Sequence, residues 1–261
     1  MHNLNENFMR TQIKTALITG GSRGLGKEMA LSIAKKNIDV ILTYKTNETT
    51  AQQVVEEIEA MGRKAAALHL DISDFSSLEN FVQQILTTLQ SKWKVNSFDF
   101  LINNAGMGAT VPFEKVTEEI FNDFLNVHFK GVYFLTQKCV PHINEGGGVI
   151  NISSGTTRFS NPGYSVYASM KGAIEVFTKY LSKELGPKRI RANVVAPGAI
   201  ETDFNNAVIR NNPQIKERIT ALTPLGRVGT AEDIGGVVAF LCTDDARWIN
   251  GQRIEVSGGI N

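Results

Sequence analysis

The chain has 261 residues, of which 42% are hydrophobic and 20% are charged, and its 27 basic residues nearly balance 26 acidic ones. This is the composition of an ordinary globular protein. The net charge of +1, without a basic stripe, argues against a nucleic-acid-binding or membrane-surface protein. The length allows two domains, although α/β folds of this size are often single.

The start of the chain, the cysteines and the histidines exclude further classes. Residues 1–13 are polar without an apolar core, so we interpret them as a tail and not as a signal peptide. No apolar run is long enough to span a bilayer. Cys139 and Cys242 are far apart and indicate a reducing compartment. The four histidines lack metal-ligand spacing, so we interpret each, His128 included, as a structural or surface residue. We therefore expect a cytoplasmic protein without a metal site, and no membrane or nucleic-acid partner.

Short β-branched runs alternate with longer helical patterns. The expected strands are 14–19, 39–44, 65–70, 98–103, 148–153, 190–196 and 253–256. The expected helices are 24–36, 50–61, 76–90, 117–140, 164–185 and 231–241. Most of the strands are continuously apolar, which is typical of a parallel sheet covered on both faces. The alternation predicts a single doubly wound α/β domain over residues 14–261.

A glycine-rich loop, TGGSRGLG, follows the first expected strand at residues 19–26. Its glycines allow a tight turn and close approach of the backbone to a ligand. The helix that follows would point its free N–H groups and positive dipole end at the loop. The position between strand and helix therefore predicts a pyrophosphate site. Its members are Gly20, Ser22, Arg23, Gly24, Leu25 and Gly26.

A tyrosine and a lysine stand one helical turn apart in YSVYASMK, residues 164–171. A tyrosine is a weak acid, with an unperturbed pKa of about 10, and an ammonium group on the same helix face would lower that pKa. Of the five tyrosines, only Tyr167 has a lysine at the fourth position after it, Lys171. The alternative is an ordinary polar helix face. Ser154, 13 residues before Tyr167 and at the end of an expected strand, favours an active site.

Further motifs occur in a consistent order along almost the whole chain. They are LDI (70–72), NNAG (103–106), FLNVHFKG (124–131), INISS (150–154), YASMK (167–171), NVVAPGAIETD (193–203) and GQRIEVSGG (251–259). Together with the glycine loop, they resemble the short-chain dehydrogenase/reductase family, in the branch that includes 3-oxoacyl-carrier-protein reductases. The resemblance implies a Rossmann-type sheet with strand order 3-2-1-4-5-6-7. It also implies a homotetramer (or homodimer) formed through helices 117–140 and 164–185 and the C-terminal strand.

The resemblance also implies contacts with a dinucleotide. Asp71 would bind the adenine, Asn104 would lie against the ribose, and residues near 200 would hold the nicotinamide. A turn-starting aspartate and a strand-ending turn are the structural alternatives for Asp71 and Asn104. The implied contacts beyond the glycine loop are Lys45, Asp71, Ile72, Asn104, Gly106, Tyr167, Lys171, Pro197, Gly198, Ile200 and Thr202.

The end of the second strand bears on the choice between NADP(H) and NAD(H). An acidic residue there binds the ribose 2′-OH and repels a 2′-phosphate. This strand ends in Lys45, and no carboxylate follows before Glu48. Lys45 and Arg23 would supply two cations for the phosphate, whereas the alternative for Lys45 is a solvated side chain. The sequence therefore favours NADP(H), with NAD(H) also possible.

The resemblance assigns roles to four catalytic residues. Tyr167 would donate a proton to a substrate carbonyl, Ser154 would orient that carbonyl, and Lys171 would hold the cofactor ribose. Asn126 would lie in a locally disturbed helix and hold a water that relays protons to Lys171. The implied reaction is the reduction of a ketone or 3-oxoacyl group to a secondary alcohol. The alternatives are an alcohol or sugar dehydrogenase of the same family, or a non-catalytic dinucleotide sensor.

Residues 200–224 interrupt the alternation of strands and helices just after the sixth strand. Ligands bind beyond the carboxyl ends of such strands, so we expect this insert to form a lid; a solvated excursion is the alternative. Arg158 and Arg210 are candidates for a basic patch that would receive a carrier protein, although an arrangement of scattered, unrelated arginines is the better explanation. The substrate residues are expected to be Ser154, Tyr164 and Tyr167, with pocket walls from Met107, Gly155, Thr156, Phe159 and 200–210.

Overall fold

Seven apolar runs form one parallel sheet in the computed structural model, which describes residues 13–260. Within this range the strand order is β3-β2-β1-β4-β5-β6-β7, as expected. All but Ile13 of the expected polar tail lies outside the described residues. The strands are β1 (Thr15–Ile18), β2 (Asp39–Tyr44), β3 (Ala65–His69), β4 (Phe98–Asn103), β5 (Ile143–Ile152), β6 (Arg191–Pro197) and β7 (Arg253–Val256).

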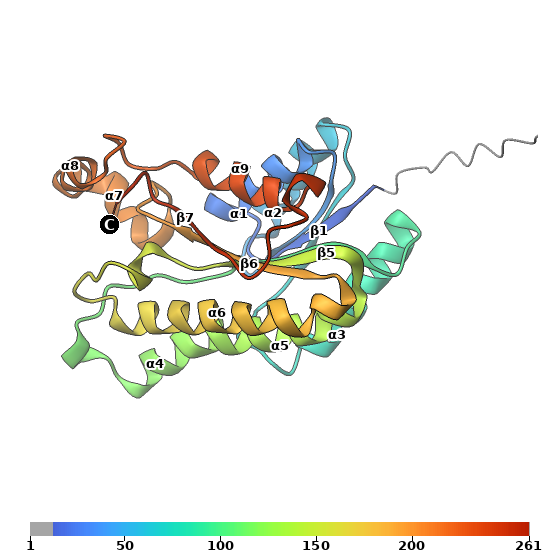
Figure 1. Ribbon diagram of the computed structural model, residues 1–261, viewed down its shortest axis with the longest axis horizontal. Coiled ribbons are helices and arrows are strands. Elements are labelled where there is room, and N and C mark those ends of the chain that lie inside the picture. Colours follow the sequence, from blue (N-terminus) through green and yellow to red (C-terminus); the bar gives the residue numbers. More distant parts are fainter. Residues whose placement is uncertain (1–12, 261) are drawn as a thin grey trace, which may run out of the picture.

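Helices cover both faces of the sheet (Figure 1). One layer contains α1 (Gly24–Ala34), α2 (Glu48–Ala60) and α9 (Ala231–Leu241). The other contains α3 (Leu78–Thr88), α4 (Glu118–Leu125), α5 (Gly131–Cys139) and α6 (Ser165–Glu184). Successive strand residues point to opposite faces, so Leu17 packs into the core under α3 and α5 and Ile18 packs into the core under α1 and α9.

Short helical turns complete these elements. Two are π turns, at Leu89–Trp93 and Asn126–Lys130. Among the described residues, the 3₁₀ turns are Phe113–Lys115, Val140–His142, Gly155–Thr157, Gly186–Lys188 and Asp244–Ala246. The π turn at Asn126–Lys130 joins α4 to α5, so the single helix expected at 117–140 consists of three parts.

Strand β5 begins five residues earlier than expected, at residue 143 and not at 148. The glycines at 146–148 are typical of a turn, which is why the sequence interpretation missed this part of the strand. In the structure the register of β4 against β5 shifts between Phe98 and Phe100. A Cβ at Gly147 would collide with the Asp99 carbonyl. The glycine therefore permits the close approach of the two strands at this irregularity.

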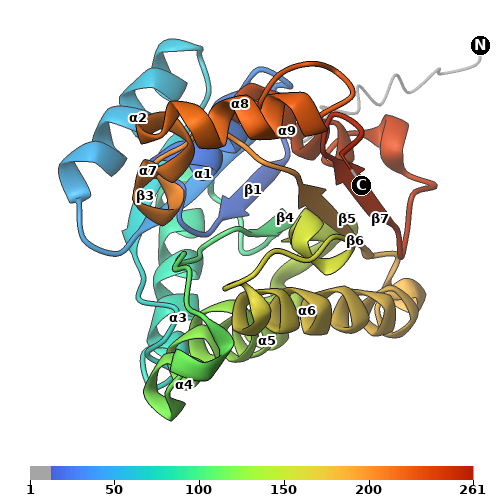
Figure 2. The same cartoon turned by 90° about the vertical axis from the view of Figure 1, so that its left-hand side faces the viewer.

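The insert at 200–224 folds into two helices, α7 (Phe204–Asn211) and α8 (Pro213–Leu222). Asn212 caps α8, because its side chain accepts hydrogen bonds from the N–H groups of Gln214 and Ile215, both at 3.1 Å. Proline at the first helical position reinforces this start. The sequence Asn212-Pro213 therefore indicates the start of a helix. Figures 1 and 2 show α7 and α8 at one end of the molecule, beside the ends of the strands.

Membrane-spanning helices and metal-binding clusters are both absent from residues 13–260. No helix in this range is both long and apolar enough to cross a lipid bilayer. No group of three or more histidine, cysteine, aspartate or glutamate side chains in the same range could hold a metal ion.

Candidate active site

The glycine loop between β1 and α1 has the tight geometry that its sequence predicts. Gly20 and Gly24 have φ values of +67° and +55°, in the left-handed region that favours glycine. A Cβ at Gly26 would collide with the Gly20 carbonyl. At the end of β4, the side-chain amide of Asn104 donates to the Thr19 carbonyl at 2.9 Å and to the Gly20 carbonyl at 3.1 Å. Asn104 therefore fixes the loop from the neighbouring strand.

The N-terminus of α1 is suited to an anion. Arg23 occupies the N-cap position in an extended conformation, and no side chain accepts the N–H groups of the first turn, which also contains no acidic residue. Free N–H groups and the positive dipole end favour a phosphate at such a terminus. The Arg23 side chain is exposed and has no ion-pair partner among the residues the structure describes. Thr202, from beyond β6, lies 3.9 Å from where a Cβ on Gly24 would stand.

Lys45 and Asp71, which the sequence interpretation assigns to different parts of the cofactor, form an ion pair at 2.8 Å. Ser73 also donates to the Asp71 carboxylate through its hydroxyl, at 2.6 Å. Burial raises the pKa of Asp71, but the hydrogen bonds from Lys45 and Ser73 outweigh it and hold that pKa below its ordinary value. The carboxylate therefore keeps Lys45 at the carboxyl ends of β2 and β3, the sheet edge that also carries the glycine loop.

The chain after β6 is fixed by its neighbours on the far side of the site. Pro197 ends β6, and the N–H of Gly198 donates to the Val256 carbonyl at 2.9 Å. A Cβ at Gly198 would stand 2.7 Å from the Cα of Ser257. Ile200 forms an isolated parallel bridge with Gly229. The segment expected to hold the nicotinamide thus has a defined path along the carboxyl edge of the sheet.

The structure brings Ser154, Tyr167 and Lys171 together. Ser154 lies two residues after the end of β5, and Tyr167 and Lys171 lie in the first two turns of α6. The Ser154 hydroxyl is a hydrogen-bond partner of Tyr167. The Lys171 ammonium donates to the Ile152 carbonyl at 2.8 Å and lies 5.6 Å from the centroid of the Tyr167 ring.

Burial dominates the proton affinities of Tyr167 and Lys171. It raises the pKa of Tyr167 to about 12, although the hydrogen bond with Ser154 lowers it. Burial also lowers the pKa of Lys171 to about 8. The sequence led us to expect that Lys171 lowers the tyrosine pKa. The structure differs, because the ammonium donates to a backbone carbonyl and burial of the phenol prevails.

Asn126 begins the π turn between α4 and α5, and its carbonyl accepts from the N–H of Gly131, five residues on. The local disturbance of the helix that the resemblance implies is therefore confirmed. The Asn126 side chain is half-buried. A Cβ at Gly131 would collide with the Ile72 carbonyl, so this glycine lets the π turn approach the chain after β3.

His128 is a residue of the site that the sequence interpretation left as structural or surface. Its ring is 1% exposed, and its centroid lies 5.1 Å from that of Tyr167 in an edge-to-face arrangement. Nε2 lies 2.8 Å from the Met107 carbonyl. Burial, and then the Lys171 charge, lower the pKa of His128 to about 3. The imidazole is therefore neutral and buttresses the loop that contains Gly106 and Met107.

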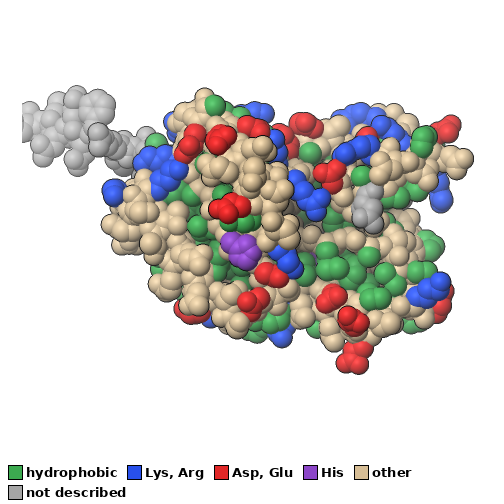
Figure 3. Space-filling view, turned by 180° about the vertical axis from the view of Figure 1, so that it is seen from behind, with side chains coloured by type: hydrophobic (Ala, Val, Ile, Leu, Met, Phe, Trp, Pro, Cys, Tyr) green, Lys and Arg blue, Asp and Glu red, His purple; other side chains and the backbone are tan. Residues whose placement is uncertain are grey.

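The insert contacts the expected substrate side of the site. Asn205 in α7 donates through Nδ2 to the Tyr164 hydroxyl at 2.9 Å and to Thr110 Oγ1 at 3.1 Å, and Thr110 Oγ1 donates to Tyr164 at 3.2 Å. Phe204 lies against Gly108. Figure 3 shows hydrophobic side chains gathered at this end of the molecule. The sequence singled out Tyr164 but missed Thr110, Phe204 and Asn205, because their contacts join segments far apart in the chain.

The two arginines considered for a basic patch are both paired with carboxylates. Arg158 bonds Glu255 at 2.6 Å, and Arg210 bonds Asp203 at 2.9 Å. Of the other expected walls, Phe159 lies against Gly155, where a Cβ would stand 2.5 Å from its ring. Phe159 therefore forms an apolar wall beside Gly155, and these two arginines have carboxylates that offset their charge.

The fold and this geometry agree with comparisons to known proteins. A family model described as enoyl-(acyl carrier protein) reductase matches residues 20–261. An uncharacterised oxidoreductase of Methylorubrum extorquens is 38% identical over 247 residues, covering 95% of this chain and 97% of the relative. A hydroxynaphthalene reductase-like protein of Metarhizium robertsii is 35% identical over 257 residues, covering 94% of each chain.

A solved structure extends the likeness to three dimensions. The angucycline C-6 ketoreductase LanV with bound NADP superimposes with a TM-score of 0.90 at 34% identity, covering 95% of each chain. Sequence and structure thus match along almost the full length. The chain belongs to the short-chain dehydrogenase/reductase family of NAD(P)-dependent oxidoreductases.

Proposed function

We propose that this protein is an NADP(H)-dependent ketoreductase that converts a ketone into a secondary alcohol. The observation that carries the proposal is the meeting of Ser154, Tyr167 and Lys171 at the carboxyl edge of the sheet, where the N-terminus of α1, after the glycine loop, has no side-chain cap. A dinucleotide sensor would need the loop but would not need a buried phenol with a hydroxyl partner. When bound, the reduced nicotinamide supplies a hydride to the carbonyl carbon.

The residues around the loop fit a dinucleotide phosphate. The first turn of α1 would hold the pyrophosphate, while Arg23 and Lys45 would bind the 2′-phosphate. Asp71 would contact the adenine in addition to holding Lys45. Lys171 would bind the ribose hydroxyls. The bound NADP in the ketoreductase LanV supports the same preference in this chain.

Tyr167 acts as the general acid. Because its pKa is about 12, the phenol holds its proton at neutral pH and can donate it to the carbonyl oxygen as negative charge develops there. Ser154 donates a hydrogen bond to the same oxygen and fixes its direction. Lys171, with a pKa of about 8, can both lose and regain a proton near neutrality. It would return a proton to Tyr167 from water near Asn126.

The substrate side favours an uncharged, apolar or aromatic ketone. Its surfaces include Phe204 and Tyr164, and the nearby Arg158 and Arg210 are occupied by Glu255 and Asp203. A phosphate-bearing acyl carrier would need free cations there. The names of the hydroxynaphthalene reductase-like relative and of the angucycline C-6 ketoreductase also support a ring ketone. We propose that α7 and α8 cover this substrate as a lid.

A substrate panel with both cofactors tests the proposal. A tetralone, a small aliphatic ketone, a 3-oxoacyl thioester, secondary alcohols and sugars are each mixed with the matching form of NADP or NAD, and nicotinamide absorbance is followed. We expect NADPH oxidation to be fastest with the ring ketone. Turnover of alcohols or sugars alone would instead identify a dehydrogenase. Cofactor binding without turnover of any compound would identify a sensor.

A further inference from the structure

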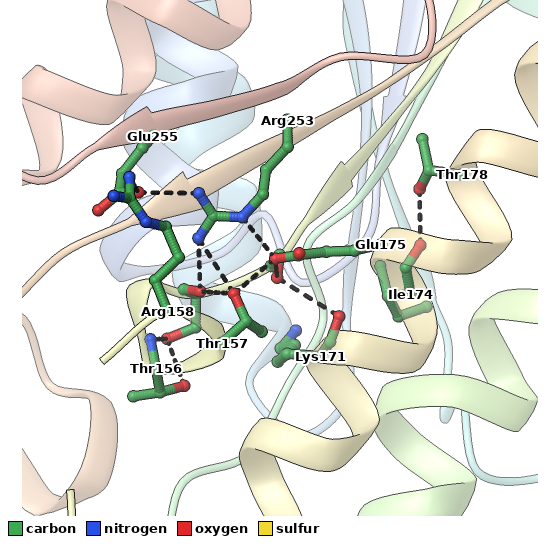
Figure 4. Close-up of polar contacts among 11 residues, drawn as sticks. Thr156, Thr157, Arg158, Lys171, Ile174, Glu175, Thr178, Arg253 and Glu255 are labelled. Atoms are coloured by element: carbon green, nitrogen blue, oxygen red, sulfur yellow. Dashed lines mark hydrogen bonds and ion pairs between the residues drawn. The ribbon is translucent and has the colours of Figure 1, made fainter. Parts of the chain in front are cut away.

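A cluster of polar side chains lies behind the loop that carries Ser154 (Figure 4). Its members come from three parts of the chain. Ser153 and Thr157 flank Ser154, Glu175 belongs to α6, and Arg253 belongs to β7. The residues of the cluster are brought together only by the fold, since Glu175 and Arg253 are 78 positions apart.

One carboxylate oxygen of Glu175 holds the loop on both sides of Ser154. Oε1 accepts from the Ser153 hydroxyl at 2.6 Å, from the Thr157 hydroxyl at 2.7 Å and from Arg253 Nε at 2.8 Å. Hydrogen bonds to an ionised acceptor are shorter and stronger than neutral ones. The carboxylate of Glu175 therefore binds Ser153 and Thr157, on either side of Ser154.

Arg253 reaches the backbone of Ser154 itself. Its Nη2 donates to the Ser154 carbonyl at 3.4 Å and to Thr157 Oγ1 at 3.0 Å, and its Nη1 donates to Glu255 Oε2 at 2.8 Å. A planar guanidinium can make these bonds and the bond to Glu175 together, whereas a lysine ammonium is a single point charge. The three interactions with the loop and α6 require the arginine fork.

The pair is largely shielded from water. The side chains of Arg253 and Glu175 are 19% and 16% exposed, compared with 32% and 65% for the pair between Lys138 and Glu79 on the surface of α5 and α3. Exposed pairs contribute little to structure. Removing one partner of a shielded pair leaves the other charge and its hydrogen bonds uncompensated.

Glu175 lies on the helix that carries the other catalytic groups. It follows Lys171 by one turn and Tyr167 by two turns of α6, so the three share a face. The Ser153 hydroxyl also lies 3.5 Å from the Lys171 carbonyl. The cluster thus ties the Ser154 loop to the helix of Tyr167 and Lys171, and it links both to β7.

We propose that Glu175 and Arg253 are positioning residues for Ser154. They fix the loop 153–158 against α6, so that the serine hydroxyl and the Tyr167 phenol converge on one carbonyl oxygen. The proposal rests on the proposed function, because it assigns the pair a part in carbonyl reduction.

A double-mutant cycle tests whether the pair acts through Ser154. Glu175→Gln keeps the size of the side chain but removes its charge, and we expect it to lower kcat about tenfold, with an unchanged Kd for NADPH. In a Ser154→Ala background the same change should cost less than about twofold, because no serine hydroxyl remains to be positioned. Arg253→Lys should behave in the same way. An equal fold-loss in both backgrounds would overturn the proposal.

Amide hydrogen exchange gives a readout that needs no substrate. We expect faster exchange in residues 153–158 for Glu175→Gln and Arg253→Lys, with little change in β1 or β4. Glu79→Gln, which disrupts the exposed pair with Lys138, is the matched control and should leave both regions unchanged. Unaltered exchange in 153–158 overturns the proposal whether or not a ketone substrate is found, whereas absence of turnover in the unsubstituted protein counts against the proposed function alone.

Discussion

Phe204 of the insert contacts the candidate proton donor: its ring centroid lies 6.0 Å from that of Tyr167, and the ring planes are inclined by 52°. The same ring lies against the loop before α4, where a Cβ on Gly108 would stand 2.7 Å from it. The aromatic ring therefore bridges α7 and α6, and it limits the space in front of the phenol.

Removing this ring should change which ketones are accepted. Phe204→Ala is expected to raise kcat/KM for a tricyclic ketone relative to a monocyclic one by about tenfold, the order of a pocket-size effect. The ratio is measured by competition between the two ketones. Phe240→Ala, which alters an aromatic side chain on α9 that is 38% exposed, should leave the ratio unchanged. The same ratio in Phe204→Ala would contradict a contact between this ring and the substrate.

Loss of the phenol should abolish most of the turnover. Tyr167→Phe keeps the ring and its contacts but removes the acid, so we expect kcat to fall at least ~10²-fold with little change in the Kd for NADPH. Tyr180→Phe, on the exposed side of the same helix, is the control and should retain the full rate. Near-normal turnover of Tyr167→Phe would identify another group as the acid.

Lys45 should decide the cofactor preference. Lys45→Ala removes a cation and also releases the Asp71 carboxylate, which would then repel a 2′-phosphate. We expect the ratio of kcat/KM for NADPH to that for NADH to fall about tenfold, as for the loss of one charged hydrogen bond. Lys138→Ala, at an exposed ion pair, serves as control. Equal efficiency with the two cofactors, before and after the change, would disprove the preference.

Burial of Lys171 predicts how stability depends on pH. Since burial lowers the folded-state pKa of Lys171 to about 8, below its ordinary value of 10.5, the unfolded chain binds more protons between these values. Stability from this group therefore rises with pH across this window. Relative to Lys171→Met, the unsubstituted protein should gain about 2 kcal/mol in free energy of unfolding from pH ~8 to ~10. Denaturant unfolding at several pH values measures the gain.

The control for this measurement is Lys183→Met, at an exposed position of α6. It should show no such trend relative to the unsubstituted protein. A constant difference between the unsubstituted protein and Lys171→Met across the window would mean that the lysine is solvated.

The homotetramer implied by the family resemblance can be tested on the outer face of α5 and α6. We propose that this face is an interface, since Tyr133, Phe134, Val176 and Tyr180 are all exposed there. Val176→Glu should place a charge within it and lower the mass in size-exclusion chromatography with light scattering. Met61→Glu, at an exposed apolar position after α2, should not. An unchanged mass for Val176→Glu would place the interface elsewhere.

The parallel sheet and the grouping of three candidate catalytic residues could be predicted because they depend on local patterns, whereas the strand order came from the family resemblance. Apolar runs separated by helical periods specify parallel strands, and their carboxyl ends meet at one edge. Ser154, Tyr167 and Lys171 follow from a strand end and a single helical turn. The disturbance at Asn126 came from the resemblance alone, since an isolated mid-helix asparagine is otherwise a surface residue.

What could not be predicted depends on contacts between distant segments. Arg253 meets Glu175 from 78 positions away, and neither is part of a recognisable motif. The pKa of Tyr167 depends on how completely the fold removes the phenol from water, and this burial raises it. The spacing of Tyr167 and Lys171 in the sequence, by contrast, indicates a lowered pKa. His128 looked like a structural residue, and only the tertiary structure places it against the catalytic ring.

The buried ammonium of Lys171 belongs to the candidate active site and also links two elements of the core. Its hydrogen bond to the Ile152 carbonyl at 2.8 Å connects α6 to the last residue of β5, a central strand of the sheet. Local unfolding of α6 at Lys171 would therefore also disrupt the packing of α6 against the sheet. On heating, the site around Lys171 and the sheet should therefore unfold as one cooperative unit.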